Sequence, residues 1–224
     1  ATAIVTLALG VGSVAAAFAI VYGVLLAPLP YGHPDRLVSV GLEARTADAR
    51  RIAQPPAVYF TYKRFARRIE NIGFYRTGNA NIWTERGDDA PERVTATWVT
   101  ASTIPLLQVA PLLGRSFTDD ETRAQGPNVA ILSESIWRTR FHAATDVIGK
   151  TLNVNSVPRK IVGVMPERFS FPASDTRLWL PVRLDQSSTV AGDFSYSGVA
   201  RLAPGATPEA AQRELATVLP RMTE

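Results

Sequence analysis

Residues 1–32 contain no Asp, Glu, Lys, Arg or His, and this uncharged stretch constrains the fold more than any other feature of the chain. Within it, residues 3–27 read AIVTLALGVGSVAAAFAIVYGVLLA. As an α-helix this segment would extend about 37 Å, enough to cross the ~30 Å hydrocarbon core of a bilayer. A helix also pairs its own backbone groups, as lipid requires. We therefore predict a transmembrane helix over residues 1–28, because Pro28 and Pro30 cannot continue it.

Small residues recur at every fourth position of this segment, at Ala8, Gly12 and Ala16. Such a row lets another helix approach closely, so these residues form a candidate helix-packing face. The alternative is that small residues are simply common in membrane spans. A cleaved signal peptide is a second alternative for the whole segment, but its apolar core is shorter, so the long run favours a retained span.

Two apparent phosphate-binding motifs fail in their sequence context. Gly10, Gly12 and Ala15 match the pattern G-x-G-x-x-A, but a Pro/Gly turn at residues 29–35 follows, where a second strand ending in an acidic residue is needed. Residues 144–151 (ATDVIGKT) resemble a relaxed phosphate loop, with bulky residues and an acid inside and an apparent strand after it. We therefore predict no nucleotide site at either place.

From Pro34 onward charged residues are regularly interspersed, and the pattern predicts a mixed domain. Short runs rich in Val, Ile, Thr and Trp between turn residues predict strands. They lie at residues 37–42, 81–85, 93–100, 128–132, 151–155, 160–165, 178–180 and 199–202. The fold class is therefore α+β, with a β-rich middle flanked by two strand–helix units.

Three helices are predicted in this part of the chain. The first begins at Pro55-Pro56 and continues to residue 72, with one apolar face made of Val58, Tyr62, Phe65, Ile69 and Ile72. Its other face carries Lys63, Arg64, Arg67 and Arg68, which we interpret as a solvated face rather than a nucleic-acid or lipid contact. The second covers residues 134–142 behind Ser133 as N-cap, and the third follows Thr207-Pro208 with Ala211, Leu215, Val218 and Met222 on one face.

The sequence contains few reactive side chains. There is no cysteine, which excludes disulfide scaffolds, thiolate metal sites and cysteine nucleophiles, and the two histidines are far apart in sequence. The acidic run Asp119, Asp120 and Glu121 could bind a hard metal ion, but Thr118 before it favours a helix N-terminus. His33 and His142 are expected at the surface, and Trp83, Trp98, Trp137 and Trp179 in packing roles.

We accordingly predict no catalytic residue, no cofactor site and no metal site, and the chain is not expected to be an enzyme. A membrane-anchored hydrolase with a spatially assembled site is a remote alternative. The formal net charge of +4 is far below that of a nucleic-acid-binding arm, so no nucleic-acid partner is expected.

Several phrases occur together in a recognisable order. They are LLAPLPY (25–31), DRLV (35–38), GRSFTDDE (114–121), AILSESIWRTRF (130–141), IGKTLNVN…IVGVMPERFSFP (148–172), LWLPV (178–182) and RLAPGATPEAAQRELA (201–216). Over nearly the whole chain the sequence resembles the MacB-like periplasmic core domain of FtsX-type ABC transporter permeases, in particular their orphan-permease branch.

The resemblance implies one membrane helix (1–28), a first porter-like part (29–78), a β-rich inserted subdomain (79–182) and a second porter-like part (183–224). It also implies a bacterial inner-membrane protein whose large domain is extracytoplasmic. Relatives have three further membrane helices and a cytoplasmic ABC ATPase, so we expect this sequence to be a piece of a longer protein. A homodimer or a related permease, and a periplasmic protein, are the further partners implied.

The function expected from the resemblance is that of a permease subunit in an ATP-driven exporter or mechanotransmission complex, non-catalytic itself. The alternative is a membrane-tethered periplasmic module that binds a partner without transport. The substrate is not predicted from this sequence.

Overall fold

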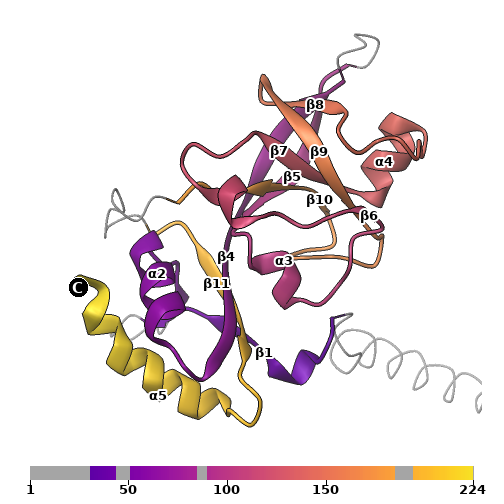
Figure 1. Ribbon diagram of the computed structural model, residues 1–224. Helices are drawn as coiled ribbons and strands as arrows, with labels where there is room; N and C mark the ends of the chain where they lie inside the picture. The colour runs from indigo at the N-terminus through magenta and orange to yellow at the C-terminus, as the bar shows by residue number, and fades with distance from the viewer. Residues whose placement is uncertain (1–30, 44–50, 85–89, 185–193, 224) are drawn as a thin grey trace, which may run out of the picture. The chain divides into compact units, whose positions relative to one another are not determined.

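One sheet of nine strands forms the framework of the described chain (Figure 1). The computed structural model describes residues 31–43, 51–84, 90–184 and 194–223. The strands of this sheet are β1 (Leu37–Val40), β4 (Ile69–Trp83), β5 (Glu92–Val99), β6 (Leu113–Gly114), β7 (Val129–Ser133), β8 (Thr151–Val154), β9 (Val157–Met165), β10 (Thr176–Pro181) and β11 (Ser197–Leu202). A separate pair joins β2 (Leu42–Glu43) to β3 (Arg51–Ile52).

The helices are α2 (Pro56–Phe65), α3 (Thr103–Leu106), α4 (Glu134–Phe141) and α5 (Pro208–Val218), with 3₁₀ turns η2 (Pro34–Arg36), η3 (Asp119–Thr122) and η4 (Leu219–Thr223). The structure is therefore mixed α and β and rich in sheet. The predicted membrane helix over residues 1–28 lies outside the described residues. Among the helices that the structure describes, none is long and apolar enough to cross a membrane.

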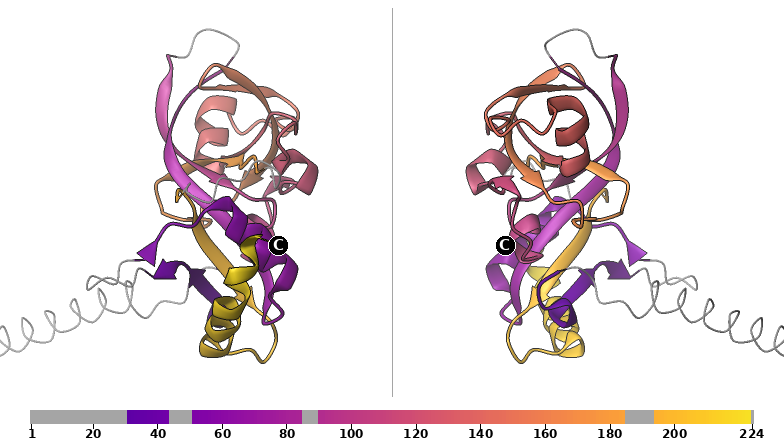
Figure 2. Two further views of the ribbon diagram at one scale, coloured as in Figure 1. Left: turned by 90° about the vertical axis from the view of Figure 1, so that its left-hand side faces the viewer. Right: turned by 90° about the vertical axis from the view of Figure 1, so that its right-hand side faces the viewer.

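Part of the sheet closes into a barrel. The order β4–β5–β10–β7–β9–β8 returns to β4, because β8 pairs with both β9 and β4. Its interior is filled by aliphatic side chains that alternate along the strands, including Ile82, Leu132 and Leu178, each 0% exposed. Figure 2 shows these strands curving around one another, and α4 packs against β7 and β9 of the barrel. We call this interior the barrel core.

A second layer joins β1, β11 and the first half of β4 to helices α2 and α5 (Figure 1). Its core contains Val58 and Tyr62 from α2, Ile72 and Phe74 from β4, and Val218 from α5. We call it the helical layer. A third apolar cluster around the fully buried Trp179 lies under α3 and includes Phe169 and Phe171.

Strand β4 belongs to both layers. Residues 69–75 pair with β11, whereas residues 75–82 pair with β5 inside the barrel. Gly73 makes room for α3 against this strand, since a Cβ there would lie 2.7 Å from the Thr103 Cα. The barrel and the helical layer therefore share one continuous strand.

One predicted helix is too long. The sequence predicted that the helix after Pro56 continues to Ile72, whereas α2 ends at Phe65 and Ala66 is extended. Ile69 and Ile72 are buried along strand β4 instead. The chain can leave the helix because the Glu214 carboxylate of α5 accepts hydrogen bonds from the backbone N–H groups of Arg67 (3.0 Å) and Arg68 (2.8 Å).

The other predicted elements are confirmed to within a few residues, except that residues 81–85 form only the end of the longer strand β4. Ser133 caps α4 by accepting from the Ile136 N–H, and Thr207 caps α5 by accepting from the Ala210 N–H. Lys63, Arg64, Arg67 and Arg68 are all exposed, and Arg67 and Arg68 follow the end of α2. A solvated face and a contact face would both be exposed, so the interpretation as a solvated face stays a prediction.

Candidate functional site: the entry turn

The described chain begins with a short turn that is fastened to three different elements. We call residues 31–36 the entry turn. The Tyr31 hydroxyl donates to the Ser170 carbonyl (3.3 Å), and its ring packs edge-on against Phe169 at a centroid distance of 6.3 Å. The Gly32 N–H donates to the Leu107 carbonyl (3.2 Å). Burial raises the pKa of the Tyr31 hydroxyl, because the ionised form would lose its hydration.

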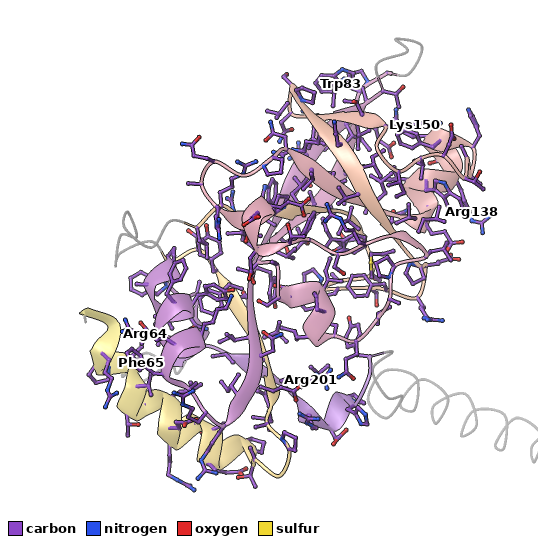
Figure 3. The ribbon with its side chains drawn as sticks, in the orientation of Figure 1. Arg64, Phe65, Trp83, Arg138, Lys150 and Arg201 are labelled. Carbon is purple, nitrogen blue, oxygen red and sulfur yellow. The ribbon has the colours of Figure 1, made fainter. Side chains whose placement is uncertain are left out.

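Arg201 on β11 holds this turn from inside the protein (Figure 3). Its side chain is only 1% exposed. Nε donates to the Leu106 carbonyl (2.7 Å), Nη1 to the His33 carbonyl (3.1 Å) and Nη2 to the Gly32 carbonyl (2.6 Å). One guanidinium thus ties the entry turn to the end of α3 and to the sheet. We call this arrangement the Arg201 clamp.

The Arg201 clamp uses carbonyl oxygens in place of a carboxylate partner. Burial, and next the neighbouring charge of Arg36, lowers the pKa of the Arg201 guanidinium from its ordinary value. An arginine nevertheless stays protonated in a protein, so the three donors remain available. Hydrogen bonds from a charged donor contribute about 1.5–3 kcal/mol each, more than neutral ones.

Arg36 fastens the end of the entry turn from the outer side. Its Nε and Nη2 donate to the Leu202 carbonyl at 3.0 and 2.5 Å, and Nη2 also pairs with the Glu70 carboxylate on β4. Two neighbouring residues of β11 therefore hold the turn in complementary ways. The Arg201 side chain donates hydrogen bonds to it, and the Leu202 carbonyl accepts them from it. A displacement of the entry turn must move β11 with it or break these bonds.

The residues singled out for chemistry do not converge. Within the described ranges, no group of three or more His, Cys, Asp or Glu side chains is placed to hold a metal ion. The acidic run forms a capping box at η3, where Thr118 and Glu121 bond to each other's backbone, so the capping interpretation is confirmed. Glu121 also forms a bidentate pair with Arg115 at 2.9 and 2.7 Å.

The apparent phosphate loop is a turn leading into a strand. Lys150 pairs with Asp146 at 2.7 Å, and β8 starts at Thr151 directly afterwards, where a phosphate loop would open a helix. His33 and His142 are both exposed, in the left-handed conformation at the start of η2 and the end of α4. Trp179 and Trp137 are buried, and Trp98 packs against the barrel core. The other candidate residues, Ala8, Gly12 and Ala16, lie outside the described part of the chain.

Sequence reasoning did not find the Arg201 clamp. The signal available was one arginine inside the apolar strand 199–202, VARL, which alone is compatible with a surface position. Its acceptors at residues 32, 33 and 106 are distant in sequence and are backbone atoms, so no residue-type pattern marks them.

The comparison with protein-family models decides the family. The model for the MacB-like periplasmic core domain matches residues 1–218. The chain belongs to this family. A search of curated proteins finds no match.

Solved structures confirm the fold of the MacB-like periplasmic core domain for this chain. A domain of a permease protein from Porphyromonas gingivalis matches with a TM-score of 0.63 and 18% identity, covering 87% of this chain and 84% of that one. The periplasmic region of MacB from Actinobacillus actinomycetemcomitans matches with a TM-score of 0.64 and 15% identity, covering 86% and 85%.

The extracellular domain of the noncanonical ABC-type transporter YknZ from Gram-positive bacteria matches with a TM-score of 0.59 and 13% identity, covering 83% of this chain and 93% of that one. At these identities the likeness concerns the fold.

Proposed function

We propose that this chain is the first membrane helix and the extracytoplasmic domain of a permease subunit in an ABC transporter system, working as an ATP-driven exporter or a mechanotransmission complex. The observation that carries the proposal is the family match over residues 1–218. The subunit itself is non-catalytic in this proposal, and a cytoplasmic ABC ATPase supplies the energy.

The proposed organisation follows the family. Residues 1–28 span the bacterial inner membrane, residues 29–78 and 183–224 form the two porter-like parts, and residues 79–182 form the β-rich inserted subdomain. The row Ala8, Gly12 and Ala16 packs against another membrane helix, in a homodimer or with a related permease. A periplasmic protein is the further partner of the domain.

The entry turn could transmit a displacement of the membrane helix to the domain in this proposal. A membrane helix that moves on ATP hydrolysis would pull on the chain at Tyr31, and the Arg201 clamp passes that displacement to β11 and α3. Strand β11 is paired along its length with β4, which continues into the barrel. Hydrogen bonds from a buried cation suit this task, because they resist displacement more than an exposed ion pair does.

Labelling tests the proposed location directly. The chain has no cysteine, so His142→Cys introduces one exposed thiol at the end of α4. A membrane-impermeant maleimide added to intact cells that express the native gene product should label this variant. The matched control is the buried Leu132→Cys, which should stay unlabelled until the protein is unfolded. Protection of His142→Cys in intact cells would place the domain in the cytoplasm and contradict the proposal.

Co-purification tests the proposed partnership. The native gene product, solubilised from membranes, should carry an ABC ATPase, and Arg201→Lys should leave that complex intact while uncoupling ATP hydrolysis from transport or signalling. A stable complex with an envelope protein and without any ATPase would instead support the tethered interaction module.

A further inference from the structure

At the end of the barrel where β7 begins, two arginines have no carboxylate partner among the residues that the structure describes. Strands β7 and β9 run parallel and both begin at this end, where the Lys160 N–H donates to the Asn128 carbonyl (2.9 Å). Strand β10 is antiparallel to β7 and leads there to Arg183. We call Asn128, Arg159 and Arg183 the barrel mouth.

Neutral acceptors fix the position of Arg183. Its Nη1 donates to the Ala124 carbonyl (3.1 Å), and its Nη2 donates to the Pro127 carbonyl (3.1 Å) and to Asn128 Oδ1 (2.9 Å). None of the ion pairs within the described ranges includes Arg183. The guanidinium is thus held in place by neutral acceptors, and no carboxylate of the described chain pairs with its positive charge.

Arg159 on β9 directly precedes Lys160, whose N–H bonds to the same Asn128 that accepts from Arg183. In the part of the chain that the structure describes, Arg159 has no hydrogen-bond or ion-pair partner. Its cross-strand neighbour on β8, Leu152, is 0% exposed in the barrel core, so Arg159 lies on the inward face of the barrel. Its Nε is buried and has no acceptor. Burial, and then the charge of Arg183, lowers the pKa of Arg159, so both contributions disfavour its charged form.

A structural role alone does not account for this pair. An arginine that only packs its aliphatic stem keeps the whole guanidinium in water, whereas the Nε of Arg159 is buried. A buried donor without an acceptor destabilises the folded state, and a second cation nearby adds to that destabilisation. An oxygen ligand with negative charge would remove both penalties.

We propose that Arg159 and Arg183 form a binding site for an oxyanion of the carboxylate or phosphate class at the barrel mouth. The planar donor fork of arginine matches both groups. Arg183 is preorganised by its three acceptors, and Arg159 is partly exposed, so an anion can reach it from solvent. This site does not depend on the proposed transport function.

Thermal unfolding of the full 224-residue chain tests the site with defined probes. Inorganic phosphate and succinate, compared with sodium chloride at equal ionic strength, should raise the Tm by a few degrees, because a ligand that binds only the folded state stabilises it. Arg159→Gln should abolish the rise. Arg213→Gln, an exposed arginine on α5, is the matched control and should keep it.

Two short peptides distinguish the source of the oxyanion. Acetyl-Gly-Asp-Gly-amide should raise the Tm and its Asn counterpart should not if the natural ligand is an acidic protein segment; binding of the free ions alone supports a small-molecule ligand. An equal rise in Arg159→Gln and the native chain, or no rise with any probe, would overturn the site.

A second measurement covers the case in which Arg159→Gln does not fold. In the native chain, the Nε–Hε NMR signals of Arg159 and Arg183 should move on titration with phosphate while those of Arg213 stay in place. Signals that stay unchanged for all three arginines would overturn the proposal independently of any variant.

Discussion

Arg201 and Arg159 are both removed from water to a large extent, and they differ in what their nitrogen atoms meet. Arg201 finds three carbonyl oxygens at 2.6–3.1 Å, whereas Arg159 has a buried Nε without an acceptor in the described chain. A third arginine, Arg115, has a bidentate carboxylate partner in Glu121. Burial alone therefore does not distinguish an arginine that stabilises the fold from one that could bind a ligand. The number of hydrogen-bond acceptors around the guanidinium distinguishes the two.

The two regions also differ in sequence range. The acceptors of Arg201, at residues 32, 33 and 106, lie 169, 168 and 95 residues away along the chain. The neighbours of Arg159 are sheet residues brought together by strand pairing. The Arg201 clamp joins segments that are distant in sequence, whereas the barrel mouth lies where paired strands of the closed barrel begin.

Removal of the Arg201 side chain should have the largest effect. Arg201→Met leaves three carbonyls without a charged donor, so we expect the free energy of unfolding to fall by about 3–5 kcal/mol. Arg201→Lys keeps the charge but lacks the planar donor fork, so it should retain only part of the stability that Arg201→Met loses. Urea unfolding followed by tryptophan fluorescence measures both. A loss below that of Arg36→Gln would contradict the Arg201 clamp.

Gly73→Ala should break the Arg201 clamp indirectly. The added Cβ meets Thr103 at its backbone Cα, so α3 must move away from β4 and take the Leu106 carbonyl with it. We expect a loss of about 1–3 kcal/mol in chemical denaturation. Gly78→Ala on the same strand meets only the Trp98 ring at 3.3 Å and is the milder control. Equal losses in the two variants would argue against a special approach of α3.

The Arg115–Glu121 pair should show its effect through pH. Burial alone would raise the pKa of Glu121, but hydrogen bonds from Arg115 and Thr118 outweigh it, so the net pKa is lowered. The stabilisation is therefore present above the unfolded-state pKa and disappears as pH falls through the folded-state value. Glu121→Gln should cost about 1–2 kcal/mol at neutral pH.

The difference between native chain and Glu121→Gln should shrink as the pH is lowered from about 6 to about 3. Unfolding curves recorded at several pH values measure it. A difference that grows on acidification would mean that the carboxyl is held in its protonated form.

Arg36→Gln and Glu70→Gln should have the smallest effects. Arg36→Gln should cost about 1 kcal/mol, because its pair with Glu70 is partly exposed and screened by salt. Glu70→Gln, which leaves the bonds to the Leu202 carbonyl in place, should cost less still. The two variants, compared at low and high salt, separate the ion pair from the backbone contact. A salt-independent loss in Glu70→Gln would contradict this division.

The sequence was sufficient to predict the elements whose cause is local. Ser133 and Thr207 mark helix starts through side-chain bonds three residues away, and both were predicted. It was insufficient where the cause is tertiary. Ile69 and Ile72 continue the helical spacing of α2, yet they are buried in a strand whose entry depends on Glu214 from the other end of the chain.

The candidate site shows the same limit. Rejection of the apparent phosphate loop at residues 144–151 needed only local chemistry, an acid among bulky residues before a strand. The Arg201 clamp and the barrel mouth depend on backbone carbonyls and on an unmet hydrogen-bond donor. Residue types do not reveal either property, because every residue, proline included, offers the same backbone carbonyl, and the fold decides whether a side-chain donor finds an acceptor.

The continuity of β4 restricts how this domain can change in length. The strand has 15 residues and extends about 50 Å at 3.3 Å per residue. One residue inserted near Tyr75 would turn every later side chain to the opposite face. The barrel core would then receive the β4 side chains that now face outward, whereas the helical layer would keep its present side chains. Length variation in homologous chains should therefore concentrate in the loops, and β4 should keep a constant residue count even where its side chains diverge.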